Sequence, residues 1–554
     1  MLPRMGIRGR LTESWRAFAQ AFRSPALRKL QLAGAGSTLA IWANSIAIAV
    51  YAYRADGAKA VGIVLFARWS LAAVFAPWLA LLADRVSRRR VMLAVDLSRA
   101  SLVAVMTIVA LTDGPSLVVY ALAVLVSIVS SGFDPAEAAL LPTLAKTPEE
   151  LTASNLALHT IASVGMFVGP AIGGLFLAFA GPWLVFALTA AAYLWSASFV
   201  FQLPHDEPPA APPDSAITTE LVAGFRAIGE SRPLQLVVGL IGAQTLVFGA
   251  LEVIVVVDAI RVLDAGNSGV GWLNTALGIG GLLGGLVGVV LAARKRLAGD
   301  FRTGLAVFGV SLMLLAATTS FGVALALFAA MGIGSTLIDV TGTTLLQRSA
   351  PEHVVGRVFG VLNTVMLVGI ATGSLIAPFI ISAFGPRPAF VAVGALLPAL
   401  AVLTWRPIDA IDRHARIAAE PLELLSGIPI FAPLPQPAIE RLASVATEVE
   451  IPAGATVFAQ GDPGDRFYVI AAGTATVEID GAEKTRLAHG DFFGEIALLR
   501  EVPRTASVLA VDALRLYALE RDDFIAAVTG YAPSREAADS IVSARLPAGA
   551  GAAV

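Results

Sequence analysis

The chain has no cysteine and only five histidines, and these shortages exclude several functions at once. Without cysteine there is no disulfide, no thiolate ligand for a metal and no cysteine nucleophile. The histidines are widely spread, so metal catalysis has few ligands to draw on. The sequence also lacks a phosphate-binding loop of the kind that holds ATP. We therefore expect no enzymatic activity and no metal site.

Charged residues are also scarce. They make up 14% of the chain, against about 25% in ordinary soluble domains, while hydrophobic residues reach 56%. The net charge of −2 gives no bulk basic character for binding nucleic acid. The apolar bias ends near Glu420, after which the composition is ordinary. This shift predicts a polytopic membrane domain followed by one globular domain.

A membrane-spanning helix needs about 20 mostly apolar residues, and twelve segments of the chain meet this requirement. A polar, proline-rich stretch from Pro204 to Glu220 cannot span lipid and reads as a linker between two sets of six. The expected fold is an α-helical polytopic membrane protein with two six-helix halves. The predicted segments are 31–53, 61–83, 91–111, 116–133, 156–180, 182–202, 234–257, 270–293, 302–319, 321–345, 356–383 and 388–405.

The distribution of lysine and arginine predicts the orientation, because these residues concentrate on the cytoplasmic side. One side collects the basic N-terminal residues and the loops around Arg85–Arg90 and Arg294–Arg296, whereas the other side carries few. We expect both termini and the C-terminal domain to be cytoplasmic, in a plasma (inner) membrane crossed many times. Residues 1–29 lack the short apolar core of a signal peptide and are typical of a basic arm at the membrane surface.

The two halves share a weak internal repeat. Asp134 and Asp339 occupy matching places 205 residues apart, and each is followed by a Leu-Leu pair and then a Pro-Glu pair. Six-helix halves repeated in the same direction are one transporter architecture. Chance similarity between two apolar segments is the alternative.

The loop after the second segment reads ALLADRVSRRR (Ala80–Arg90). It resembles the signature of the major facilitator superfamily, although Ala80 and Ser87 stand where glycines are usual. The resemblance implies a gate latch that stabilises one access state, and a positive-inside loop with an incidental aspartate is the alternative. The matching residues are Asp84, Arg85, Arg88 and Arg89.

Two further stretches, DLSRA (Asp96–Ala100) and LLPTLAKTPEELTASN (Leu140–Asn155), resemble the bacterial efflux branch of that superfamily. This branch includes enterobactin-exporter-like and macrolide-exporter-like members. The resemblance covers roughly residues 25–405 and is specific for fold and transport, but it says little about the substrate.

Several polar residues fall inside apolar segments, where they are costly and usually face a cavity or a partner. Arg99 lies one turn after Asp96, so a local ion pair is the simplest interpretation. A buried carboxylate can carry a proton, which makes Glu252 and Asp339 coupling candidates, with interhelical hydrogen bonding as the alternative. The transport and coupling candidates are Asn44, Arg99, Glu252, Asp339 and Asn363, with Gln244 and Asn274 as further polar positions.

From Phe431 onward the pattern changes to short alternating strands separated by Gly and Asp turns, such as Gly461–Asp465 and His489–Asp491. Eight short strands closed into a β jelly roll are the natural packing. We expect flanking helices at Gln436–Val445 and Arg521–Val528, with a third at Ser534–Arg545.

The stretch FFGEIALLREVPRTASV (Phe492–Val508) closely resembles the phosphate-binding cassette of cyclic nucleotide-binding domains. Glu495 can accept a hydrogen bond from the ribose 2′-hydroxyl, and Arg504 offers forked donors and a charge for the cyclic phosphate. A jelly roll with an inactive pocket is the alternative. The resemblance implies a pocket made by Phe493, Gly494, Glu495, Ile496, Ala497, Arg504, Thr505 and Ala506.

The expected regulatory ligand is a cyclic nucleotide, with cAMP favoured over cGMP, although Thr505 suits both. The C-terminal helix is short, and only Tyr531, Arg535 and Arg545 suggest a lid over the base. The expected division is a basic arm (1–29), a first half (30–203), a linker (204–232), a second half (233–406), a connector (407–430), the nucleotide domain (431–546) and a disordered tail (547–554).

Together these features predict a secondary active transporter that exports a small organic compound, driven by protons and regulated by the nucleotide. The alternative is a cyclic-nucleotide receptor whose membrane domain is an anchor or substrate sensor without transport. A gated channel is disfavoured because no arginine-ladder helix and no filter-like segment are present. The expected partners are a small-molecule substrate, the nucleotide and the lipid bilayer, but no nucleic acid; the sequence does not predict the oligomeric state.

Overall fold

The computed structural model describes residues 22, 24–206, 217–292, 297–350, 354–410 and 419–545. The chain divides into two compact units, which we call the membrane unit (Met1–Asp409) and the C-terminal unit (Ala410–Val554). Most of the expected N-terminal arm, the middle of the linker, part of the connector and the tail lie outside the described residues.

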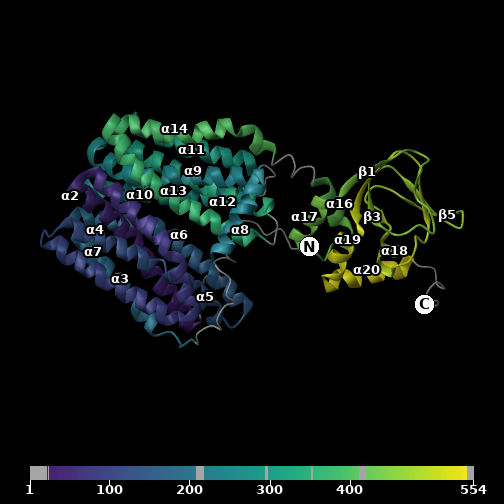
Figure 1. Ribbon diagram of the computed structural model, residues 1–554, viewed down its shortest axis with the longest axis horizontal. Coiled ribbons are helices and arrows are strands. Elements are labelled where there is room, and N and C mark those ends of the chain that lie inside the picture. The colour runs from purple at the N-terminus through teal and green to yellow at the C-terminus, as the bar shows by residue number, and fades with distance from the viewer. Residues whose placement is uncertain are drawn as a thin grey trace. The chain divides into compact units, whose positions relative to one another are not determined.

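Helices make up the membrane unit (Figure 1). Eleven of them, among the described residues, are long and apolar enough to cross a membrane. The first of these spans lies in α2, where non-helical Gly57 (φ 76°, ψ −168°) separates the first two predicted segments. The twelve predicted segments therefore overlap eleven spanning helices, several segments running a few residues past a helix end, and twelve crossings stay a prediction.

The helices of the membrane unit follow in this order: α2 (Pro25–Arg85), α3 (Arg88–Leu111), α4 (Ser116–Ser130), α5 (Phe133–Leu144), α6 (Pro148–Phe179), α7 (Pro182–Phe201), α8 (Ile217–Glu230), α9 (Arg232–Val257), the π-helical turn η1 (Asp258–Val262), α10 (Gly266–Ala292), α11 (Leu297–Leu315), α12 (Phe321–Ser349), α13 (Val355–Phe384) and α14 (Pro386–Leu403).

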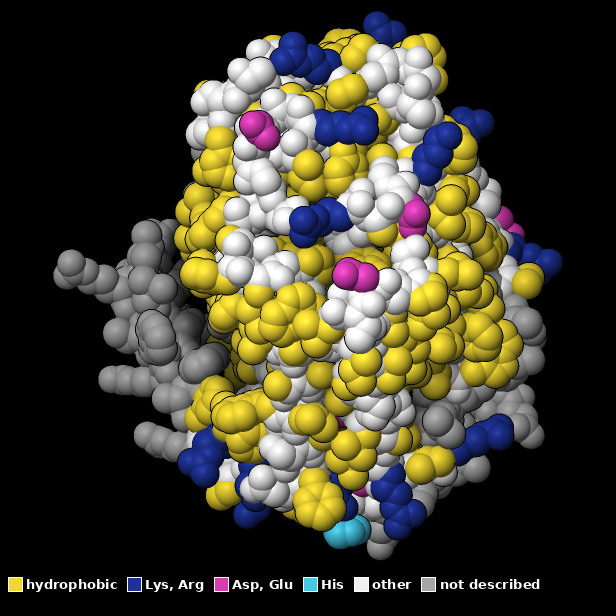
Figure 2. Space-filling model, turned by 90° about the vertical axis from the view of Figure 1, so that its left-hand side faces the viewer, with side chains coloured by type: hydrophobic (Ala, Val, Ile, Leu, Met, Phe, Trp, Pro, Cys, Tyr) yellow, Lys and Arg dark blue, Asp and Glu magenta, His cyan; other side chains and the backbone are white. Residues whose placement is uncertain are grey.

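Large apolar side chains cover much of the surface of this unit. Phe179, Phe384 and Leu403 are each at least 70% exposed, and Figure 2 shows a face where hydrophobic side chains outnumber charged ones. Soluble monomers rarely expose so much contiguous apolar surface. The surface therefore fits a lipid environment.

The two halves of the membrane unit meet through small residues. Helix α6 crosses α10 at Gly174 and Gly271, where a Cβ added to Gly271 would lie 2.3 Å from the Gly174 Cα. Helix α2 approaches α13 at Gly62, where a Cβ would lie 2.5 Å from the Ser374 carbonyl oxygen. Small residues allow membrane helices to approach this closely, so backbone forms the contact at Gly174 and Gly271, whereas Gly62 also meets the Pro378 ring.

The C-terminal unit contains the predicted jelly roll. Two antiparallel four-stranded sheets have the strand orders β1-β8-β3-β6 and β2-β7-β4-β5. The elements are α16 (Ala419–Gly427), α17 (Gln436–Val445), β1 (Thr447–Ile451), β2 (Thr456–Phe458), β3 (Arg466–Ala472), β4 (Ala475–Ile479), β5 (Ala482–Leu487), β6 (Phe492–Phe493), α18 (Glu495–Arg500), β7 (Ser507–Ala510), β8 (Leu514–Glu520), α19 (Arg521–Thr529) and α20 (Ala532–Arg545).

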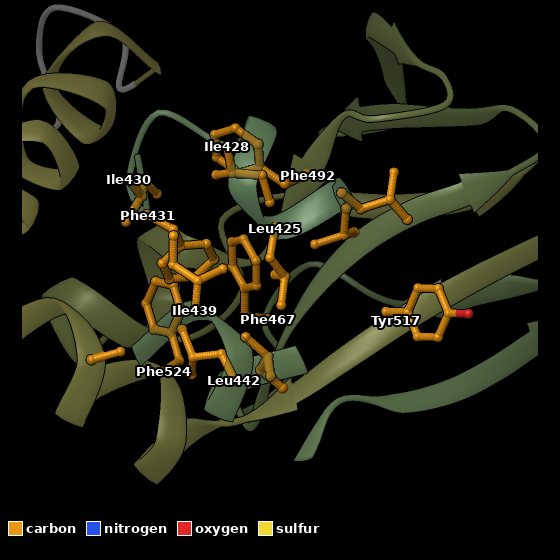
Figure 3. Packing of buried hydrophobic residues seen from close by; sticks show 14 of the residues in the cluster. Leu425, Ile428, Ile430, Phe431, Ile439, Leu442, Phe467, Phe492, Tyr517 and Phe524 are labelled. Carbon is orange, nitrogen blue, oxygen red and sulfur yellow. The ribbon is translucent and has the colours of Figure 1, made fainter. Parts of the chain in front are cut away.

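An aromatic core joins the roll to its helices (Figure 3). Phe467 on β3 stacks on Phe524 of α19 with ring centroids 4.7 Å apart, and Phe431 packs edge-on against both rings. Leu425 of α16 and Ile428 just beyond it are buried in the same cluster. Because each large aromatic side chain contributes strongly to core burial, α16 belongs to the folded C-terminal unit.

Polar contacts add to this attachment. The Glu420 carboxylate accepts hydrogen bonds from Arg515 (2.5 and 2.8 Å) and from the Tyr517 hydroxyl (3.0 Å) on β8. The hydrogen bonds from Arg515, assisted by the one from Tyr517, lower the pKa of Glu420. The start of α16 is thus held to β8 by a charged pair as well as by its apolar face.

Candidate functional site

The C-terminal unit contains a cavity of about 580 Å³ beside the cassette. This volume suits a small-molecule ligand, for which pockets of about 300–1,000 Å³ are usual. All eight residues that the sequence assigned to the pocket line it, and their contacts with a nucleotide stay a prediction. Phe458, Val477, Ile479, Lys484, Thr485, Leu487, Val508 and Arg545 also line it.

Arg504 is prearranged at the wall of this cavity. The residue is 3% exposed, and its guanidinium donates to the carbonyl oxygens of Gly494 (3.1 Å) and Arg466 (2.8 Å). It also pairs with Asp465 at 2.9 Å and lies 4.1 Å from the centroid of the Phe458 ring. Its Nε has no partner among the described residues. The result is an oriented cation with a donor left over for an anion.

Gly494 makes this arrangement possible. Its backbone is left-handed (φ 93°), and a Cβ there would lie 2.7 Å from Arg504 Nη1 and 2.9 Å from the Arg466 carbonyl oxygen. Only glycine combines that backbone with that approach at little cost. The turn starts α18 at Glu495 and brings the carboxylate and the guanidinium to the same cavity.

Glu495 is 1% exposed and is held by the C-terminal helix. Arg545 donates to Glu495 Oε1 at 2.8 Å and to the Phe492 carbonyl oxygen at 3.0 Å. Of the three lid residues expected from the sequence, Arg545 lines the cavity, whereas Tyr531 is 40% exposed and Arg535 is also exposed.

The sequence analysis assigned Asp465 no role in the pocket, and it named Arg545 only as a candidate lid residue. Asp465 stood in a recognised turn, Gly461–Asp465, but its pairing with Arg504 bridges 39 residues. A separation of this length is set by the roll, and no local pattern shows it.

In the membrane unit, the gate motif joins the start of α3 to the end of α7. Arg89 is 8% exposed and donates to the carbonyl oxygens of Val200 (3.2 Å) and Phe201 (2.5 Å). The side chain of Asp84 lies outside the described part of the chain. The latch role of Asp84, Arg85, Arg88 and Arg89 stays a prediction.

A second carboxylate, Asp206, caps this helix start. It accepts from the Ser87 hydroxyl (2.6 Å) and from the backbone N–H groups of Arg88 (2.6 Å) and Arg89 (3.3 Å). Partial burial acts to raise the pKa of Asp206, but these hydrogen bonds outweigh it, so the pKa lies below its usual range. The sequence analysis placed Asp206 in a linker and gave it no role.

The transport candidates are dispersed. Glu252 lines a cavity of about 50 Å³ together with Trp42, Phe248 and Asn274, and it accepts a hydrogen bond from Trp69 Nε1 at 3.0 Å. Asn44 is buried on α2, two residues after Trp42, but it does not line this cavity. Asp339 and Asn363 are exposed on α12 and α13.

Arg99 forms the expected ion pair with Asp96, and both side chains are fully buried. They lie among other polar groups of α2, α5 and α7. None of these candidates apart from Glu252 shares that cavity, so the structure does not gather the predicted residues into one transport site.

Comparisons with known proteins also divide the chain into two parts, although the first match extends into α16. Residues 16–424 match the family described as Transmembrane secretion effector, and residues 448–531 match the Cyclic nucleotide-binding domain. The Multidrug efflux pump Tap of Mycolicibacterium fortuitum is 27% identical over 320 residues, covering 56% of this chain and 78% of that protein.

Two relatives match the C-terminal unit. The cAMP-dependent protein kinase regulatory subunit of Aspergillus niger is 36% identical over 102 residues, which is 18% of this chain and 25% of that protein. The cGMP-dependent protein kinase egl-4 of Caenorhabditis briggsae is 35% identical over 120 residues, which is 20% of this chain and 16% of that protein. The chain spans a quarter or less of the length of these relatives.

Proposed function

Because the chain belongs to the family described as Transmembrane secretion effector, within the major facilitator superfamily, we propose that it exports a small organic compound under cyclic nucleotide control. Its family makes it a multi-pass membrane transporter with a cyclic nucleotide-binding domain. We further propose that protons drive the export, and that the C-terminal unit lies on the cytoplasmic side of the inner membrane.

The observation that carries this proposal is the prearranged pair of Arg504 and Glu495 on one cavity. A buried guanidinium with a free donor suits a cyclic phosphate, and a buried carboxylate suits a ribose hydroxyl. An inactive pocket would not need either charge, because burying charge without a ligand is costly.

The favoured nucleotide is cAMP. The Aspergillus relative is named for cAMP, and cGMP remains the competitor because the Caenorhabditis relative is named for it. Lys484 and Thr485 of β5 line the cavity and lie outside the cassette. We propose that these side chains contribute to the choice of base.

The nucleotide regulates transport only by its differential affinity for two access states. Coupling of this kind is worth about 1–3 kcal/mol, or about 5–150-fold. Helix α16 is the first described element after the membrane unit, and it packs on the aromatic core beside β3. We propose that movement of the cassette reaches the transporter through α16.

The test is transport of ethidium, used as a probe of efflux, by the full chain in proteoliposomes with an imposed pH gradient. We expect cAMP to change the rate, and Arg504→Ala to abolish that change by removing the charge for the phosphate. Arg500→Ala is the matched control, because Arg500 is about half exposed and does not line the cavity.

A wild-type rate that saturating cAMP and cGMP leave unchanged would refute the regulation. Nucleotide binding by calorimetry without transport of any probe would instead favour the receptor alternative.

A further inference from the structure

The first half of the membrane unit contains a polar cluster, most of it buried, that the proposed function above does not use. Helices α2, α3, α5 and α7 pack around it, and α6 contributes Ser154. We call it the N-half cluster, and it consists of Gln31, Ser37, Asp96, Arg99, Asp134, Glu137, Ser154, Tyr193 and Ser196.

Arg99 is the centre of this cluster. It pairs with Asp96, whose second oxygen accepts from the Ser196 hydroxyl at 2.7 Å. The guanidinium donates to Ser37 at 3.1 Å and lies between the rings of Phe133 (4.7 Å) and Tyr193 (4.4 Å). Although Arg99 is 0% exposed, its Nε and Nη1 have no partner within the described chain. A fully buried cation thus keeps two unused donors.

Glu137 lies on α5 and faces Gly34 of α2, which has no side chain. Its Oε1 is buried and has no donor among the described groups. A Cβ added to Gly34 would lie 2.7 Å from that oxygen, so α2 leaves room for the carboxyl group only because residue 34 is glycine. This oxygen is therefore enclosed without the hydrogen bonds that an ionised carboxylate needs.

The charges of the cluster do not balance. Within the described residues, the charged groups that act on Glu137 are Asp134, Asp96 and Arg99. The facing residues of α2 and α6 are the uncharged Gln31, Ser37 and Ser154, and α7 contributes Tyr193. Asp96 and Glu137 thus share the one guanidinium of Arg99 in a membrane interior, with the exposed Asp134 beside them, and unpaired charge there is expensive.

The excess negative charge identifies the group that takes up a proton. Asp96 is committed to Arg99 and Ser196, and Asp134 is exposed. Glu137 alone of the three combines an enclosed oxygen with no donor. The two free donors of Arg99 offer a partner for Glu137 once its proton has left.

We propose that Glu137 carries the coupling proton of transport, and that Arg99 receives its carboxylate when the proton is released. This inference rests on the proposed proton-driven export and names the site for it, in place of Glu252 or Asp339. Release breaks the O–H bond of the carboxyl group, passes the proton to water and forms an ion pair with Arg99 Nε or Nη1. No other group changes its charge in this step.

The internal repeat does not place a carboxyl group at the matching position of the second half. Three residues after Asp134 stands Glu137, whereas three residues after its repeat partner Asp339 stands Gly342. A Cβ on Gly342 would meet Phe301 at 2.9 Å and Ile241 at 3.0 Å, so its surroundings are apolar. Glu137 therefore has no counterpart at this position of the repeat.

The test is infrared spectroscopy of the full chain in lipid nanodiscs as the pH is changed, with the proton itself as the probe. A protonated carboxyl group has a C=O stretch apart from that of a carboxylate. We expect wild type to show a titrating carboxyl band that Glu137→Gln removes. Glu150→Gln is the matched control, because Glu150 on α6 accepts from the Lys146 backbone N–H outside the cluster, and it should leave the band unchanged.

The same titrating band in Glu137→Gln would overturn the proposal, provided that calorimetry finds the C-terminal unit folded and the variant remains monodisperse. A second measurement separates this inference from the proposed function. If wild-type vesicles move ethidium faster with a pH gradient and Glu137→Gln retains that stimulation, the proton site is wrong and the exporter stands. If wild type moves no probe, the export proposal fails, and the infrared band alone decides whether Glu137 titrates.

Discussion

The membrane unit and the C-terminal unit each bury an arginine, but they hold it in opposite ways. Arg99 is paired with a carboxylate, Asp96, that is as buried as itself. Arg504 is held mainly by backbone carbonyls, and its carboxylate partner, Asp465, is 66% exposed. Both arginines leave Nε without a partner in the described structure.

The difference shows what each unused donor is for. Beside Arg504 lies a cavity of about 580 Å³, so its donor can meet a ligand that arrives from outside. Arg99 lies between two aromatic rings and does not line either cavity described above, so its donors can meet only a group of the protein or a water. One arginine is thus built for binding and the other for an internal exchange.

The largest expected effect comes from removing the buried partner. Asp96→Asn removes the buried carboxylate that is paired with Arg99, which costs about 3–5 kcal/mol of unfolding free energy. All eight tryptophans precede residue 406, so tryptophan fluorescence during thermal or denaturant unfolding reports on the membrane unit.

The matched change in the other unit is Asp465→Asn, and there we expect a cost of about 1 kcal/mol or less, because Asp465 is largely exposed. Its effect is measured by calorimetric unfolding of the C-terminal unit. Equal losses in the two variants would show that burial of the partner is not what separates the two arginines.

The next effect concerns the glycine beside Arg504. Gly494→Ala adds a Cβ that collides with Nη1 of Arg504 at 2.7 Å. We expect nucleotide affinity, measured by calorimetry, to fall about tenfold, equivalent to about 1.4 kcal/mol.

Gly490→Ala is the control for backbone strain. Gly490 is also left-handed (φ 86°), but a Cβ there would meet nothing within 4 Å. It should lower stability without lowering affinity. Equal losses of affinity would mean that strain in the roll, and not the position of Arg504, limits binding.

The smallest expected effect concerns Asp206, a carboxylate that backbone N–H groups hold, whereas arginines hold the carboxylates considered above. Asp206→Ala should destabilise the membrane unit by about 1 kcal/mol, the usual value for loss of a helix cap. Because the folded pKa of Asp206 is lowered, its contribution is complete above the unfolded value of about 4 and is lost as the pH falls below that.

Tryptophan-monitored unfolding between about pH 6 and pH 3 should therefore show wild type and Asp206→Ala converging at the acid end. Glu230→Ala, an exposed change at the end of α8, should run parallel to wild type throughout. A constant gap between wild type and Asp206→Ala would contradict the cap.

Features that repeat along the chain could be predicted from the sequence. The apolar segments placed all of the long helices, and alternating residues with glycine turns placed a roll of eight strands. The sequence could not show that the first two segments lie in one element around Gly57, because a kink of backbone geometry leaves the apolar pattern unbroken.

The cassette was visible because its residues, from Phe492 to Val508, are contiguous. The sequence alone gives no reason to single out Glu137, which lies three residues after Asp134. Its significance comes from Gly34 and Arg99, which reach it from other helices. Asp206 was likewise read as part of a linker, since only the folded chain brings it to the start of α3.

The crossing of α6 and α10 has a mechanical consequence. At Gly174 and Gly271 one backbone rests directly on another, with no side chains interlocked between them. Interlocked side chains must separate before one helix can slide past its neighbour. Two helix surfaces made of glycine have no such side chains to separate. The two halves can therefore move against each other at this crossing, and a single methyl group at either glycine would obstruct that movement.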